Sequence, residues 1–259
     1  MRRLALGLEY DGTNYNGWQI QSHAPSIQAT LNGALSSVAD ESINCVGAGR
    51  TDTGVHATCQ VVHFDTVAKR EMRSWLLGIN SNLPDDVNVL SVQRCTGEFH
   101  ARFSATGRAY RYVILNRPVR SALLRERAWW VREPLDVPAM TAAAQCLVGE
   151  HDFSSFRASA CQAHTPVRQM RTLTIEAVGD RIVLECEANA FLQHMVRNIA
   201  GTLVAIGSGE EDIAWLSAVL ESMDRTRGGV AAPPHGLTLV RVNYPGEFGI
   251  PAPLALGRQ

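Results

Sequence analysis

The stretch that connects two apolar runs near the start of the chain reads GAGRTDTGVHA, residues Gly47–Ala57. The flanking runs, Ile43–Val46 and Val61–Phe64, have the length of short strands. Glycines let other groups approach a backbone closely, and loops held by strands often carry functional side chains. The stretch therefore predicts a strand–loop–strand unit, with Asp52 central and Arg50 close enough to keep its carboxylate ionised.

Outward from this loop, apolar residues either alternate, as in strands, or recur at helical spacing. Alternation predicts strands over residues 4–10, 87–92, 107–116 and 236–242, and helical spacing predicts helices over 27–38, 72–83, 137–147, 191–206 and 213–220. The turn pair Gly179-Asp180 separates two further strand patterns, 170–178 and 181–188, as in a β-hairpin. This irregular order favours an α+β fold with mainly antiparallel sheet over a doubly wound fold.

Two subdomains with similar element content are expected, residues 1–104 and 105–259. Each is predicted to be an α/β unit with helices packed on one side of its sheet, and an active-site cleft is expected between them. The first carries the Asp52 loop; the second carries the strand with Tyr110 and the helix with Arg197.

Bulk composition narrows the class of protein. The 259 residues are 46% hydrophobic and 19% charged, and the apolar stretches are too short to span a bilayer, which predicts no membrane association. The opening is basic but alternates and soon meets acidic residues, which argues against a signal peptide. Six cysteines show neither a CxxC pair nor zinc spacing, so free thiols in a reducing cytoplasm, and no metal, are expected.

Charge is unevenly distributed along the chain. The net charge is −1, yet eight arginines between Arg94 and Arg127 face only Glu98 and Glu126, a local excess of six positive charges. The segment from Ala205 to Asp224 instead has five acids and no base. One region can thus face a polyanion while another faces water, although scattered, solvated arginines are an alternative reading.

Three side chains are candidates for chemistry. Asp52 is either a turn-capping aspartate or a nucleophile, and a nucleophilic carboxylate needs a fixed cation to stay ionised when substrate excludes water. Arg197 stands within the apolar helix pattern and is either that cation or a surface arginine with its stem on the core. Tyr110 shares a strand face with Tyr112, so both rings could stack on bases or could be core residues.

Several blocks together resemble the TruA family of tRNA pseudouridine synthases. Gly47–Ala57 resembles the family's catalytic motif, with Thr53 where alanine is usual. Further blocks follow in family order: Tyr10-Asp11-Gly12 with Gly17-Trp18-Gln19, Arg102–Ala105 with Tyr110-Arg111-Tyr112, Asp152–Phe156, and Phe191–Asn198. The resemblance covers nearly the whole chain to about Tyr244 and is less clear beyond it.

The resemblance implies an isomerase that converts uridine to pseudouridine in the anticodon stem-loop of tRNA, at positions 38, 39 and 40. By similarity Asp52 is the nucleophile, attacking either C6 of the base or C1′ of the sugar. Tyr110 would stack on the flipped target base and assist removal of its C5 proton, and Arg197 would pair with Asp52. Arg50 would fill the vacated stack or brace the neighbouring phosphate. The resemblance also implies a homodimer that needs no cofactor or metal.

Two other classes of function share part of this pattern. A hydrolase of N-glycosidic bonds would use Asp52 and a base pocket but would release free uracil. A non-catalytic RNA-binding module would need the arginines but not Asp52.

Overall fold

The computed structural model describes residues 1–250, and residues 251–259, the end of the tail that follows Tyr244, lie outside the described part. The chain forms a mixed α/β structure with mainly antiparallel strands, as the sequence predicts. It divides into two compact units: residues 1–106 with the described residues from Leu239 on, and residues 107–238. Among residues 1–250 no helix is long and apolar enough to cross a membrane.

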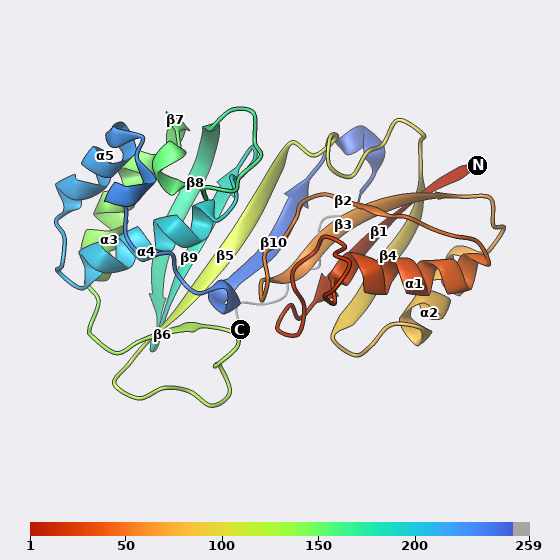
Figure 1. Ribbon diagram of the computed structural model, residues 1–259, viewed down its shortest axis with the longest axis horizontal. Helices are drawn as coiled ribbons and strands as arrows, with labels where there is room; N and C mark the ends of the chain where they lie inside the picture. Colours follow the sequence, from red (N-terminus) through yellow and green to blue (C-terminus); the bar gives the residue numbers. More distant parts are fainter. Residues whose placement is uncertain (251–259) are drawn as a thin grey trace. The chain divides into compact units, whose positions relative to one another are not determined.

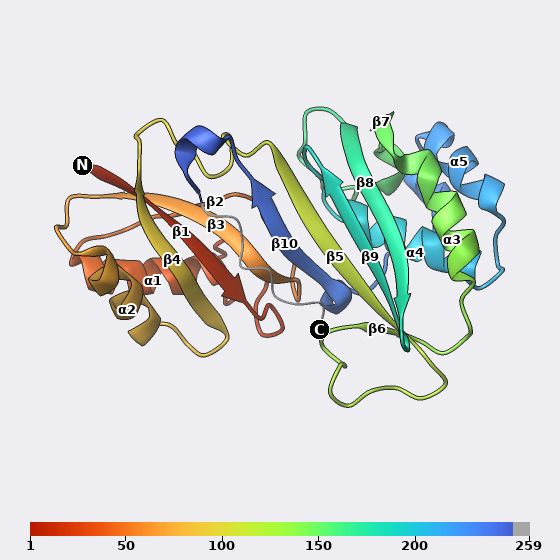
Figure 2. The ribbon, with the colours of Figure 1, turned by 180° about the vertical axis from the view of Figure 1, so that it is seen from behind.

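The first unit contains a sheet with the strand order β4-β1-β3-β10, and β2 pairs with β3. Its elements are β1 (Arg2–Tyr10), α1 (Ile27–Ala39), β2 (Val46–Gly47), β3 (His56–Thr66), α2 (Met72–Ser81), β4 (Val87–Cys95) and most of β10 (Leu237–Asn243). Strand β1 runs antiparallel to both β3 and β4. Helices α1 and α2 lie on one side of these strands, in front in Figure 1 and behind in Figure 2.

The second unit contains the strand order β5-β9-β8-β7, with β6 parallel to β5. Its elements are β5 (Gly107–Asn116), β6 (Trp129–Val131), α3 (Val137–Ala144), β7 (Gly149–Asp152), β8 (Val167–Val178), β9 (Arg181–Ala188), α4 (Met195–Gly207) and α5 (Ile213–Ser222). The hairpin predicted at Gly179-Asp180 is confirmed, because β8 and β9 are antiparallel around it. Helix α4 lies against the strands on their front side in Figure 1.

Local side-chain chemistry sets the helix starts. Ser26, Asp136 and Asp212 are N-cap residues whose side chains accept hydrogen bonds from backbone N–H groups in the first turns of α1, α3 and α5. The prediction that the fourth helix begins at Phe191 is wrong: α4 begins at Met195, because His194 has a φ of 62°, which a right-handed helix excludes.

Candidate active site

Asp52 lies in the turn that joins β2 to β3, so the predicted strand–loop–strand order is confirmed. The predicted bounds are wrong, because β2 covers only Val46–Gly47 and β3 already begins at His56. The N–H of Val55 donates to the carbonyl of Asp52 at 3.1 Å, which closes the turn. The N–H of Ala48 donates to the carbonyl of Val61 at 2.8 Å and continues the strand pairing into the loop. The Asp52 side chain is half-buried at the end of this supported turn.

Buried polar groups hold the loop from below. The Tyr10 hydroxyl lies 2.9 Å from Oγ1 of Thr51, the residue before Asp52. Nε2 of Gln60 donates to the Gly49 carbonyl at 2.8 Å and also reaches the Tyr10 hydroxyl at 3.4 Å. Burial raises the pKa of Tyr10 to about 12, so the phenol stays protonated and can donate. Thr51 and Gln60 are themselves buried, so the network fixes the loop backbone.

A second loop, residues 11–18, packs directly against the first. The N–H of Trp18 donates to the Thr51 carbonyl at 3.0 Å. Gly17 has a φ of +86°, and a Cβ placed on it would lie 2.5 Å from the same carbonyl oxygen. Only glycine both adopts this φ readily and leaves room for the Thr51 carbonyl, which explains why glycine occupies this position of the block Gly17-Trp18-Gln19.

The start of β3 contacts the same loop through polar groups that the sequence pattern does not reveal. Nδ1 of His56 accepts a hydrogen bond from the N–H of Gly12 at 3.1 Å and lies 3.0 Å from Oδ1 of Asp11. His56 is buried. In the sequence, only its position four residues after Asp52 could have drawn attention to His56. Its contact with Asp11 depends on the pairing of β1 with β3, which the sequence does not reveal.

Arg50 is exposed, and within residues 1–250 no ion pair joins it to Asp52. That Arg50 lies near enough to keep Asp52 ionised stays a prediction. The side chain extends from the turn into solvent, where it can contact an anionic partner.

Tyr110 lies in β5, which ends at the predicted residue Asn116. Its side chain is 9% exposed, and its ring meets that of Phe191 edge-on with centroids 5.0 Å apart. Tyr112, two residues on, is fully buried and donates to the Pro233 carbonyl at 2.8 Å. Tyr112 is therefore a core residue, one of the two alternatives that the strand pattern leaves open, and the stacking role of Tyr110 stays a prediction.

Arg197 lies in the first turn of α4 and is half-buried. Its Nε donates to the Ala232 carbonyl at 2.8 Å, and the Ala232 N–H donates to the Arg197 carbonyl at 3.0 Å. Segment 230–232 comes this close because Gly201 has no side chain: a Cβ there would lie 1.7 Å from the Val230 carbonyl oxygen. The guanidinium is therefore held at one edge and has a defined orientation.

The structure places Asp52 in the first unit and both Tyr110 and Arg197 in the second. Within the second unit, burial raises the pKa of Tyr112 well above its usual range, and the positive charge of Arg197 acts in the opposite direction. Tyr110 and Arg197 lie on neighbouring elements, because strand β5 and helix α4 are in contact. That these two act together with Asp52 stays a prediction.

The local excess of positive charge is smaller in the folded chain than along the sequence. Arg111 forms a two-point ion pair with Glu185, its partner across β5 and β9. Arg117 pairs with Asp180 at 2.8 Å. Strand pairing therefore supplies acids that the count over residues 94–127 leaves out.

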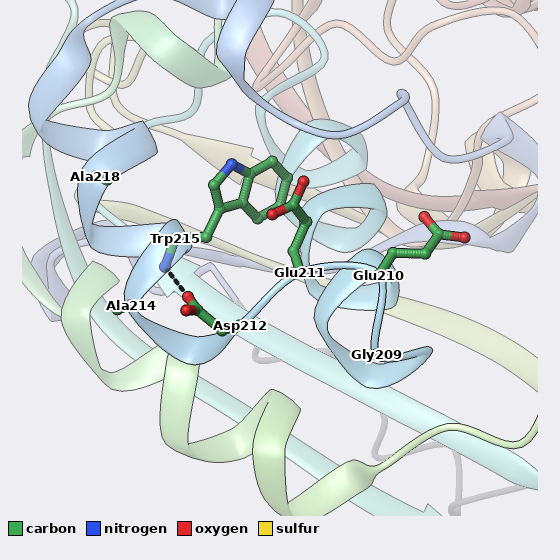
Figure 3. Close-up of a pocket in the computed structure, with 7 residues that line it drawn as sticks. All are labelled: Gly209, Glu210, Glu211, Asp212, Ala214, Trp215 and Ala218. Atoms are coloured by element: carbon green, nitrogen blue, oxygen red, sulfur yellow. Dashed lines mark hydrogen bonds between the residues drawn. The ribbon is translucent and has the colours of Figure 1, made fainter.

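A hollow of about 620 Å³ opens at the start of α5 in the second unit (Figure 3). It is lined by Gly209, Glu210, Glu211, Asp212, Ala214, Trp215 and Ala218. Asp212 is occupied as the N-cap, accepting from the Trp215 N–H at 2.8 Å. Three acidic side chains repel a polyanion, so this hollow is a poor site for a nucleic acid.

Comparison with known proteins adds to this geometry. Residues 8–104 and 143–245 match a family described as tRNA pseudouridine synthase. The protein named tRNA pseudouridine synthase A of Methylococcus capsulatus is 54% identical over 96% of this chain and 92% of its own. Those of Coxiella burnetii (50%, covering 97% and 96%) and Pseudomonas aeruginosa (53%, covering 96% and 88%) are similarly close. A solved structure from Galdieria sulphuraria aligns with a TM-score of only 0.23 at 13% identity and carries no argument.

Proposed function

Because the chain belongs to the tRNA pseudouridine synthase family, whose members are isomerases, we propose that it converts uridine to pseudouridine in the anticodon stem-loop of tRNA, at positions 38, 39 and 40. In this reaction the C1′–N1 bond breaks, C5 bonds to C1′, the C5 proton is lost and N1 gains a proton. Substrate and product contain the same atoms, so the reaction needs no co-reactant.

Asp52 is the proposed nucleophile. The observation that carries this assignment is the support of its turn: Thr51 is held by a buried hydrogen bond and Gly49 by a partly buried one, while Asp52 itself is half-buried. A carboxylate that only capped its turn would not need a buried tyrosine and glutamine beneath it. Fixed placement favours a near-attack geometry, which is a large part of what an enzyme supplies.

The other site residues act on the same uridine in this proposal. Residues 1–104 carry Asp52 and Arg50; residues 105–259 carry Tyr110 and Arg197. The target base flips out of its stack, which costs a few kcal/mol that aromatic and cationic contacts offset. Tyr110 stacks on the base, Arg197 pairs with the carboxylate, and Arg50 contacts the backbone or the gap that the base leaves.

The test is product analysis with an unmodified tRNA transcript. Wild-type protein should form pseudouridine without releasing uracil, and Asp52→Ala should form none while its tRNA affinity stays within several-fold. Free uracil in stoichiometric yield would identify a glycosidic hydrolase instead. Turnover by Asp52→Ala would remove the nucleophile assignment, and binding without any turnover by wild type would leave only an RNA-binding module.

A cytoplasmic homodimer is part of the same proposal, because one tRNA lying across two subunits would share their arginines and compensate for a net charge of −1 per chain. Light scattering of the free protein tests the dimer. A mass of 28.2 kDa, that of one chain, would contradict it.

A further inference from the structure

The segment Phe99–Ser104 in the first unit carries an aromatic side chain that the proposed chemistry does not use. Phe103 is 77% exposed, the most exposed aromatic ring among residues 1–250. Trp130 is the other aromatic residue that is more than a third exposed, at 40%, and its indole N–H donates a hydrogen bond to the Arg117 carbonyl. Exposing an apolar ring is unfavourable unless a partner covers it.

Hydrogen bonds within the loop support its backbone beneath Phe103. The His100 N–H donates to Oγ of Ser104 at 3.0 Å, and the Ser104 N–H returns a bond to the His100 carbonyl at 2.8 Å. Nδ1 of His100 accepts from the N–H groups of both Arg102 and Phe103, at 3.2 and 3.1 Å. The tip is therefore held by its own hydrogen bonds, which favour this conformation.

The base of the loop is anchored in the core. Phe99 and Ala101 are fully buried. Nδ1 of His63 accepts from the Ala101 N–H at 3.1 Å, and the Tyr244 hydroxyl donates to the Ala101 carbonyl at 2.6 Å. An exposed ring on such a support loses little conformational entropy when it binds, which favours a recognition role over a loose surface residue.

Two neighbours define the chemistry around the ring. The His100 ring stacks on Phe103 with centroids 4.3 Å apart and planes inclined by 27°. The Arg102 guanidinium carbon lies 5.6 Å from the centre of the Phe103 ring. Burial, with the charges of Arg3 and Arg102, lowers the pKa of His100, so this support is uncharged at neutral pH. A flat apolar face beside a guanidinium matches a partner that is planar and anionic.

We propose that Phe103, supported by His100, stacks on an unpaired base of the bound tRNA, and that Arg102 contacts an adjoining phosphate. Base–aromatic stacking of this kind tolerates any base, because each base has a π-face, and arginine adds an electrostatic contribution. The proposal rests on tRNA being the substrate. It adds a binding contact that is separate from the reacting groups Asp52, Tyr110 and Arg197.

Substitution at Phe103 tests the contact directly. With an unmodified tRNA transcript, Phe103→Ala should raise Kd and KM roughly five- to hundredfold and leave kcat nearly unchanged. Phe103→Trp should keep wild-type affinity, and its added fluorescence should be quenched by the transcript. Arg102→Gln should lower the salt dependence of log Kd by about one phosphate contact.

A matched control lies on α2 of the same unit. Leu77 is 53% exposed, so Leu77→Ala removes a comparable exposed apolar side chain. It should leave Kd and KM unchanged, and the added fluorescence of Leu77→Trp should not respond to the transcript. An equal loss of affinity in Leu77→Ala would make the Phe103 effect nonspecific and would overturn the proposal.

The remaining outcomes separate this inference from the proposed function. If wild type makes pseudouridine while Phe103→Ala has wild-type Kd and KM, the stacking contact is wrong and the function stands. If Phe103→Ala changes the mass of the free protein but not its tRNA affinity, the ring faces a second copy of the chain and the proposal is again wrong. If wild type makes no pseudouridine, the function itself fails.

Discussion

The Tyr10 hydroxyl and Oγ1 of Thr51 lie 2.9 Å apart in the buried interior, although the two residues are 41 positions apart in the sequence. Thr51 is the residue directly before Asp52. This contact links the end of β1 to the loop that carries Asp52. It means that the position of the proposed nucleophile depends on a strand that carries none of the chemistry.

Tyr10→Phe removes that link while keeping the ring. The buried Thr51 hydroxyl loses its partner, so the free energy of unfolding should fall by about 1–3 kcal/mol. Turnover should fall while KM changes little, because the loop loosens without losing an RNA contact. Urea unfolding and single-turnover kinetics measure both effects. Thr51→Val serves as the matched partner: if the two losses simply add in the double variant, the residues are not coupled.

Gly17→Ala tests the close approach of the second loop. It combines a backbone conformation that alanine rarely adopts with a Cβ 2.5 Å from the Thr51 carbonyl oxygen. Gly179, at a φ of +62°, has no neighbour within 4 Å of an added Cβ, so Gly179→Ala isolates the conformational cost of roughly 1–2 kcal/mol. Gly17→Ala should destabilise the protein by more than this and should also reduce turnover. Equal melting temperatures for the two variants would contradict the steric argument.

Arg197→Ala should reduce turnover far more than tRNA affinity. The side-chain bond to the Ala232 carbonyl disappears, but the backbone bond from Ala232 to the Arg197 carbonyl remains, so α4 should keep its place. Parallel measurement of kcat and Kd distinguishes the roles. A change confined to Kd would make Arg197 a phosphate contact. Arg197→Lys keeps the charge but cannot both bind the Ala232 carbonyl and pair with a carboxylate as a guanidinium can, so its turnover should lie between those of wild type and Arg197→Ala.

Tyr110→Phe should keep the packing against Phe191 and remove only the hydroxyl. If that hydroxyl assists removal of the C5 proton, kcat falls and Kd stays near wild type. Tritium release from a transcript labelled at C5 of uridine reports this step directly. Wild-type release rates would end the proton-transfer role and leave stacking as the function of the ring.

The buried His63 predicts a fall in stability with acid. Burial, with the nearby charges of His100 and Arg3, lowers its pKa from 6.5 to about 4. Between these values the unfolded chain binds a proton that the native protein does not, so the free energy of unfolding decreases as pH falls from about 6.5 to about 4 and is fully available above this window. His63→Gln should flatten the slope there in urea unfolding. The pKa of Asp65 is also lowered, chiefly by hydrogen bonding to Arg3, so its protonation overlaps only the acid end of this window and the slope is best compared above about pH 5. Identical slopes for variant and wild type would contradict the assignment.

The local fold followed closely from sequence pattern. β5 spans the predicted residues 107–116, and α1 begins one residue after Ser26, the N-cap. These elements are set by alternation, helical spacing and capping, which act over a few residues. The start of α4 was mispredicted because nothing in the apolar pattern of 191–206 reveals a left-handed backbone at His194.

The site was less predictable, since its supports come from distant segments. The sequence around Asp52 makes this residue a candidate by itself, but Gln60 shows only as a polar residue inside the apolar run of β3. Its role needs the register that places the Gly49 carbonyl 2.8 Å away. Likewise, Arg111 reads as a free positive charge until the pairing of β5 with β9 puts Glu185 opposite it.

The place of β10 has a consequence for how the protein is made. This strand lies near the end of the sequence, yet it pairs with β3 and completes the sheet of the first unit. Chains emerge from the ribosome from the N-terminus, and domains usually fold in that order. Here residues 107–238 are all available before Leu239–Asn243, so the unit that is synthesised first is the last to complete its sheet. Until β10 is synthesised, the part of the β3 edge beyond its short pairing with β2 stays unpaired, and an unpaired strand edge favours strand-mediated aggregation of a nascent chain.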